Sequence, residues 1–147
     1  MNGTWRDCID VAELPELYRT IAEAIGRELM IELAVKCQKV HFYFRQLPED
    51  AEKLSEDYLI AANAIGLDNV RKLAAALPSE MFYLVDEDLV FMSAKKRWIV
   101  ENFTGNNHRR LSIETRLSQP FVYKILRKPG WQQLDLFMED MKAPLVN

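Results

Sequence analysis

The basic side chains of this 147-residue sequence are concentrated towards its C-terminal end. Residues 92–130 contain nine Lys and Arg against two Asp and Glu, a net charge of +7, whereas residues 1–91 carry −8 and residues 131–147 carry −2. Ammonium and guanidinium groups neutralise phosphates, so a basic segment on an acidic body is typical of a protein that meets a polyanion. Charge alone is equally compatible with a solvated charged face.

The apolar residues of this basic segment are spaced for two short helices that cross closely. Leu111 is followed by the small Ser112, and apolar side chains recur 6, 11 and 14 places after Leu111. Two helices joined by a three- or four-residue turn at roughly 90–120° need this pattern, because the small residue admits the neighbouring helix. The spacing predicts a helix-turn-helix over residues 108–128. Its small core would contain Leu111, Leu117, Val122, Ile125 and Leu126.

The second of these helices would expose a polar and basic face. Ser118 is placed to cap its first turn, where Pro120 costs little because an N–H there has no helical partner. In a major groove, Gln pairs with adenine, Lys and Arg reach guanine or phosphate, and Tyr donates to phosphate. Basic residues on the preceding helices would add phosphate contacts that do not depend on sequence. The predicted DNA-contacting residues are Lys95, Lys96, Arg97, Arg109, Arg110, Ser118, Gln119, Pro120, Tyr123, Lys124, Arg127 and Lys128.

Further elements must position this motif. Residues 93–103 are predicted to form a helix that Ser93 caps. A turn follows over residues 104–107, where Asn107 can cap the next helix. Arg116 occupies the turn position that commonly adopts a left-handed conformation, which costs a residue with a side chain about 1 kcal/mol.

The acidic part contains an internal repeat with a spacing of 40 residues. Residues 14–46 align with residues 54–86 without a gap, and 11 of the 33 pairs are identical, against about two expected by chance. Each copy has apolar residues at helical spacing, then a glycine, a second helical stretch and an aromatic stretch that favours a strand. We interpret the pattern as a tandem duplication of a helix–helix–strand unit.

One such unit cannot enclose a core, and its single strand has two unpaired edges. Two units solve both problems if their helices pack together and their strands pair. We therefore predict a mainly α (α+β) fold, with a pseudo-symmetric four-helix unit and a two-stranded antiparallel ribbon followed by the helix-turn-helix domain. The ribbon residues are Phe42, Tyr43, Phe82 and Tyr83. The predicted domains are an N-terminal extension (1–13), the duplicated unit (14–91), the helix-turn-helix domain (92–130) and an amphipathic C-terminal tail (131–147).

Several short motifs occur in a characteristic order. They are Phe103-Thr104-Gly105-Asn106-Asn107, Leu111, Ser118 and Val122-Tyr123-Lys124. Together with the two helices and the strand before them, these motifs make residues 54 to about 128 resemble the Mor/C transcription activators of Mu-like bacteriophages. Residues 14–46 look like a second copy of the N-terminal part of that family without a DNA-binding half. The chain departs from the family pattern at Arg116, in place of a turn glycine, and in strands without an Ile-Pro ending.

The resemblance implies a sequence-specific DNA-binding transcription activator. Family members are similar in being dimers with interlocked N-terminal helices and paired strands, which bind a dyad-symmetric site and engage RNA polymerase. Here one chain carries both halves of that interface. We favour a monomer with an intrachain pseudo-dimer, because a seven-residue linker keeps the two repeats at high local concentration; a homodimer with exchanged repeats is the alternative. The other functional hypothesis is a protein-interaction module that retains the fold but has lost DNA binding.

Other chemistry has little support in the residue pattern. Cys37 and His41 have no second Cys/His pair at a suitable spacing and no third residue to orient them, so we predict no metal, cofactor or enzymatic activity. The acidic residues 86–88 are interpreted as a solvated linker that caps the next helix. With no apolar stretch of about 20 residues and no export signal at the N-terminus, we expect a cytoplasmic protein that does not enter a membrane.

Overall fold

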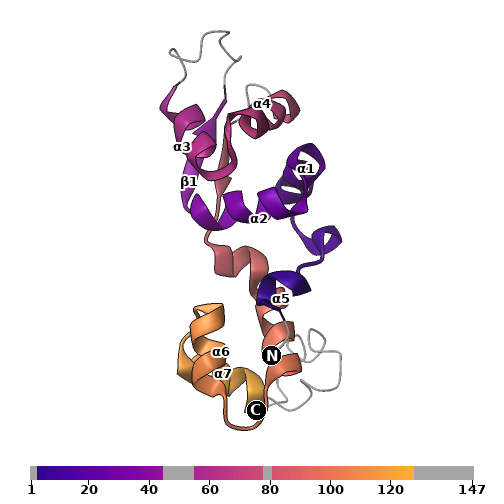
Figure 1. The fold of residues 1–147 in the computed structure, drawn as a ribbon, viewed down its shortest axis with the longest axis vertical. Coiled ribbons are helices and arrows are strands. Elements are labelled where there is room, and N and C mark those ends of the chain that lie inside the picture. Colours follow the sequence, from indigo (N-terminus) through magenta and orange to yellow (C-terminus); the bar gives the residue numbers. More distant parts are fainter. Residues whose placement is uncertain (1–2, 45–54, 78–80, 128–147) are drawn as a thin grey trace. The chain divides into compact units, whose positions relative to one another are not determined.

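The computed structural model describes residues 3–44, 55–77 and 81–127, and Figure 1 shows their arrangement within each part of the chain. The described residues form seven α-helices and one sheet of two strands, so the predicted mainly α (α+β) class is confirmed. None of these helices is long and apolar enough to cross a membrane. Outside the described residues lie the whole of the predicted tail, the linker between the repeats, and Lys128.

The chain divides into two compact units. The first unit spans Asp10–Phe91, and the second combines the N-terminal residues up to Ile9 with the chain from Met92 onward. The second unit is therefore built from segments that lie at opposite ends of the sequence. The boundary falls within a single helix, α5 (Glu87–Asn102).

The first unit contains two helix–helix–strand segments in succession, preceded by a short 3-10 helix, η2 (Val11–Glu13). Their elements are α1 (Glu16–Ile25), α2 (Arg27–Lys36) and β1 (Val40–Tyr43), then α3 (Glu56–Ile65), α4 (Leu67–Ala76) and β2 (Met81–Leu84). Each helix of the second segment lies 40 residues after its counterpart, which is the spacing of the sequence repeat. Gly26 and Gly66 separate the paired helices at φ values of 96° and 88°, a region that favours glycine because a Cβ would be strained there.

The four helices pack between the two segments as well as within each of them. α1 contacts α4, and α2 contacts α3, so both helices of each segment pack against the other segment. The facing side chains are apolar, as the helical spacing of the sequence requires. This arrangement produces one shared core, whose almost fully buried members include Ile21, Met30, Ile31, Leu33, Tyr58, Ala61, Val70 and Leu73.

The two strands pair antiparallel, as predicted, with Phe42 opposite Phe82. These two phenylalanines occupy equivalent positions in the sequence repeat, so equivalent residues of the two segments face each other in the ribbon. Both rings are buried, with centroids 5.5 Å apart, whereas Tyr43 and Tyr83 are exposed on the outer face. Pairing in this register buries one face of the ribbon against the helices, because alternate side chains of a strand point to opposite faces.

Helix α5 begins at Glu87, earlier than the predicted start at Ser93. The Asp86 carboxylate accepts a hydrogen bond from the Asp88 backbone N–H at 2.9 Å, which stabilises the first turn of the helix. Phe91 is buried, and its ring packs edge-on against Tyr18 at 6.5 Å. The helix starts early because this apolar contact holds its first turns against α1.

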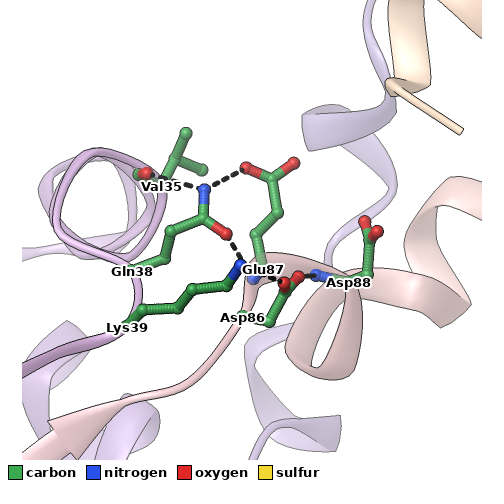
Figure 2. A network of polar contacts seen from close by, with 6 residues as sticks. All are labelled: Val35, Gln38, Lys39, Asp86, Glu87 and Asp88. Atoms are coloured by element: carbon green, nitrogen blue, oxygen red, sulfur yellow. Dashed lines mark hydrogen bonds and ion pairs between the residues drawn. The ribbon is translucent and has the colours of Figure 1, made fainter.

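Figure 2 shows the polar contacts around the start of α5. The Gln38 side-chain nitrogen donates to the Val35 carbonyl at 3.1 Å and to the Glu87 carboxylate at 3.0 Å, and the Gln38 oxygen accepts from the Glu87 backbone N–H at 2.9 Å. Lys39 forms an ion pair with Asp86 at 3.2 Å. Glu87 is only 5% exposed, so the predicted solvated linker is wrong for this residue. A buried carboxylate needs hydrogen-bond donors, and Gln38 supplies one from the first repeat.

The second unit contains a small helical core. Besides residues 92–102 of α5 it includes a 3-10 helix, η1 (Trp5–Cys8), and the helices α6 (His108–Thr115) and α7 (Gln119–Arg127). α6 and α7 pack against each other (Figure 1). The predicted core residues Leu111, Leu117, Val122 and Ile125 are buried, and Leu126 is half-buried.

Candidate nucleic-acid interface

The loop between α5 and α6 is closed by the side chain of Asn107. Its Oδ1 accepts from the Thr104 backbone N–H at 2.9 Å, and its Nδ2 donates to the Asn102 carbonyl at 2.9 Å. Gly105 has a φ of 106°, which explains why glycine stands there. Asn107 occupies the predicted N-cap position of α6, but its side chain makes no capping hydrogen bond to the helix. The side chain instead bonds back to the loop and to the end of α5.

A tight turn joins α6 to α7. The Ser112 hydroxyl donates to the Leu117 carbonyl, and the Leu117 N–H donates to the Thr115 hydroxyl at 3.4 Å. Arg116 adopts the predicted left-handed conformation, with φ 62° and ψ 25°. Its side chain is exposed, so the guanidinium group remains solvated. These contacts bring the two helices together with their apolar sides facing inward.

The outer face of α7 is polar, basic and accessible. The Ser118 hydroxyl accepts from the Phe121 backbone N–H at 3.2 Å, so the predicted cap at the start of this helix is confirmed. Val122 and Ile125 are buried on the inner side. The side chains exposed on the other side or at the start of the helix are those of Ser118, Gln119, Pro120, Tyr123, Lys124 and Arg127.

The cations nearest this face are available to a ligand. Arg109 and Arg110 are exposed in the first turn of α6, and Lys124 and Arg127 are exposed on α7. Within the described part of the chain, no acidic side chain forms an ion pair with any of these four. Four exposed positive charges that no described acidic side chain neutralises create a local potential that attracts phosphate groups.

The basic residues of α5 are placed differently from the prediction. Lys95 is completely buried, and its ammonium group lies 4.7 Å from the centre of the Trp5 ring. A buried ammonium cannot reach a phosphate, so the predicted phosphate contact is wrong for Lys95. Arg97 is half-buried and donates to the Cys8 carbonyl at 2.9 Å, and Lys96 is also half-buried. Residues 3–9 thus cover part of α5 that sequence reasoning assigned to DNA.

One residue near the interface was not predicted. The His108 ring lies 4.1 Å from the Tyr123 ring at an interplanar angle of 30°, and 4.8 Å from the Phe103 ring at 62°. His108 therefore connects the end of the α5–α6 loop to the exposed face of α7. The helix pattern gave no sign of this contact, because it depends on how α6 and α7 cross.

Metal chemistry has no geometric basis in the described residues, where no three His, Cys, Asp or Glu side chains gather as ligands. Cys37 is buried, and burial raises the pKa of its thiol, which disfavours the thiolate that a metal needs. His41 is exposed and stacks on Tyr83, with ring centroids 4.4 Å apart. In Cys8, burial first and then the nearby Glu101 raise the thiol pKa.

Comparison with known families relates this geometry to a function. The model of the Mor transcription activator family matches residues 38–135, which is well over half of the chain. The match includes both helices of the second repeat, both strands, and the whole of α5, α6 and α7. No curated protein and no solved structure matches the chain.

Proposed function

Because this chain belongs to the Mor transcription activator family, we propose that it regulates transcription by binding double-stranded DNA in a sequence-specific manner. In this proposal α7 enters the major groove, and the first turn of α6 contacts the phosphate backbone. We also propose a role as an activator that engages RNA polymerase, which the description of the family as transcription activators supports. A protein-interaction module that has lost DNA binding is the competing function.

The observation that carries the proposal is the exposed face of α7 with exposed cations beside it that form no ion pair among the described residues. Gln119 and Lys124 present hydrogen-bonding groups that can distinguish base edges, whereas Arg109 and Arg110 are suited to phosphates. The small core beneath holds this face at the surface, since Val122 and Ile125 are fixed by packing against α6. The net charge of +7 over residues 92–130 adds an attraction that does not depend on sequence.

The test begins with selection of a preferred duplex from a random library, followed by titrations at several salt concentrations. We expect the logarithm of affinity to fall linearly with the logarithm of salt concentration, because bound phosphates release counterions. Reversing Arg109 and Arg110 to Glu should weaken the selected and a scrambled duplex together and reduce the salt slope by about two. Gln119→Ala should instead reduce base discrimination by about 1–3 kcal/mol.

A charge-matched control is available in the first unit. Arg19 and Lys72 are both exposed, on α1 and α4, and reversing both to Glu changes the net charge by the same amount. If this control lowers the salt slope as much as the Arg109/Arg110 reversal, the proposed face is wrong. Salt-insensitive association with another protein and no binding to any duplex would favour the interaction module.

We further propose that the chain acts as a monomer with one DNA-reading head. The pairing of β1 with β2 and the packing of α1 with α4 within one chain support this assembly. A symmetric dimer would obtain the same contacts from two chains. Light scattering should give a mass near 17.1 kDa, whereas twice that mass would support exchange of repeats between two chains.

A further inference from the structure

We propose that His108 is a positioning residue that orients Tyr123 on the DNA-facing surface and so contributes to base-sequence preference. The inference rests on the proposed function, since it concerns the same face of α7. It assigns His108 no direct contact with DNA. Its action is exerted through the Tyr123 ring.

The geometry of the rings carries the argument. The planes of His108 and Tyr123 are 30° apart at a centroid distance of 4.1 Å, so the imidazole covers a face of the phenol ring. The Phe103 ring packs edge-on against the imidazole, with ring centroids 4.8 Å apart, and so restricts rotation of the imidazole from a second side. Aromatic pairs prefer such offset and edge-to-face arrangements, and each pair restricts the rotamers of its members.

The backbone around His108 is also held in place. His108 is the first residue of α6, and Asn107 before it is hydrogen-bonded to both Thr104 and Asn102. The imidazole is half-buried, whereas the Tyr123 side chain is 41% exposed. A rigid residue therefore supports an accessible one, which is the relation expected between a supporting group and a contact group.

A free tyrosine on a helix surface would sample several rotamers, and binding would have to select one of them. The contact with His108 already restricts the Tyr123 rotamers in the free protein, so less side-chain entropy is lost when DNA binds. A tyrosine held in one orientation favours sites whose base edge lies where its hydroxyl points, so the benefit is larger for the preferred duplex than for an arbitrary one.

The test compares His108→Ala, His108→Phe and a control, Ile113→Ala, on the selected duplex and on a scrambled one. Ile113 lies on the same helix and is exposed, and its replacement alters no charge. We expect His108→Ala to lower affinity for the selected duplex about two- to tenfold, the range of one aromatic pair, with a smaller effect on the scrambled duplex. His108→Phe retains a stacking ring and should restore affinity to within about twofold of the original.

Two further measurements separate positioning from general loss of structure. Thermal unfolding of each variant reports the fraction folded, and the His108→Phe variant remains informative if His108→Ala unfolds. In a Tyr123→Ala background, His108→Ala should have no further effect on affinity, because the residue acts through the missing ring. Additive effects of the two substitutions would overturn the inference.

The remaining outcomes distinguish this inference from the proposed function. If the unmodified chain prefers the selected duplex but His108→Ala binds it equally well, only the inference fails. Equal weakening of both duplexes, or a His108→Phe variant as weak as His108→Ala, also overturns it. If the unmodified chain shows no preference among duplexes, the proposed function fails and the inference fails with it.

Discussion

The two units of this protein differ in how some of their polar residues are used. In residues 10–91 several polar groups form hydrogen bonds within the unit. Gln38 donates to the Glu87 carboxylate. The Tyr43 backbone N–H donates to Asp57 at 2.8 Å, and the Val85 N–H donates to the Tyr18 hydroxyl at 3.1 Å. In residues 92–127 the cations at the start of α6 and along α7 have no acidic partner among the described residues and face solvent. The hydrogen bonds named in the first unit stabilise its fold, whereas the exposed cations of the second unit are available to a ligand.

This difference indicates that stability and the proposed DNA binding can be altered separately. A substitution in the core of the first unit should lower the free energy of unfolding and leave the duplex preference of the folded protein unchanged. A substitution on the outer face of α7 should change the duplex preference and leave the free energy of unfolding nearly unchanged. Three substitutions test this division, and each is measured by chemical denaturation and by binding to the selected duplex.

The largest effect is expected for Phe42→Ala. Phe42 is almost fully buried and contacts the Phe82 and Phe44 rings at 5.5 and 5.6 Å, so the substitution leaves a cavity at the centre of the ribbon. The free energy of unfolding should fall by about 3–5 kcal/mol. His41→Ala is the matched control, because His41 lies next to Phe42 on the exposed face. Equal destabilisation by the two variants would mean that the ribbon is not buried on one face.

A smaller effect is expected for Tyr18→Phe. The Tyr18 hydroxyl is the acceptor for the Val85 N–H, and its removal should lower the free energy of unfolding by about 1 kcal/mol at neutral pH. Duplex preference should not change, since Tyr18 belongs to the first unit. A change in preference without loss of stability would contradict the division between the two units.

The same residue predicts a pH dependence. Burial raises the pKa of the Tyr18 phenol above its ordinary value near 10, although the hydrogen bond from Val85 opposes this in part. The unfolded chain therefore loses this proton at a lower pH than the folded protein. The contribution to stability is fully present below about pH 10 and is lost as the pH rises through the folded-state pKa. The Tyr18→Phe variant should show a shallower alkaline decline, measured by urea denaturation at a series of pH values.

The smallest effect is expected for Arg116→Gly. Glycine relieves the strain of the left-handed turn but loses more conformational entropy on folding, so stability should rise by only about 0.5 kcal/mol. Arg116→Ala is the control, because it removes the same charge and keeps the strain. A gain in stability for both variants would indicate charge repulsion among the neighbouring arginines rather than backbone strain.

Much of the fold could be predicted because it is encoded by local spacing. The repeat at 40 residues located the four helices of the first unit, and the glycines between them marked the helix ends. The aromatic residues located the two strands and their antiparallel pairing, whereas the register, with Phe42 opposite Phe82, came from the structure. The start of α5 could not be found this way, because it depends on the contact of Phe91 with Tyr18, a residue far away in the chain.

The candidate interface was predicted on α7 and mispredicted on α5. Helical spacing separates Val122 and Ile125 from Gln119 and Lys124 whatever lies around the helix, so the exposed face could be deduced. No local pattern shows that Trp5 covers Lys95, since 90 residues of sequence separate them. A charge count therefore overestimates the cations that are available to DNA.

The sequence by itself determined which stretches become helices and strands, which sides of them are apolar, and where positive charge gathers. These properties depend on neighbours within one or two helical turns, and periodicity records them directly. Only the tertiary structure decided that Glu87 is buried beside Gln38, that Lys95 is covered by Trp5, and that His108 meets Tyr123. Each of these depends on which distant surfaces come together when the apolar faces are buried, and burial then decides whether a charged or aromatic side chain supports the fold or remains available to a partner.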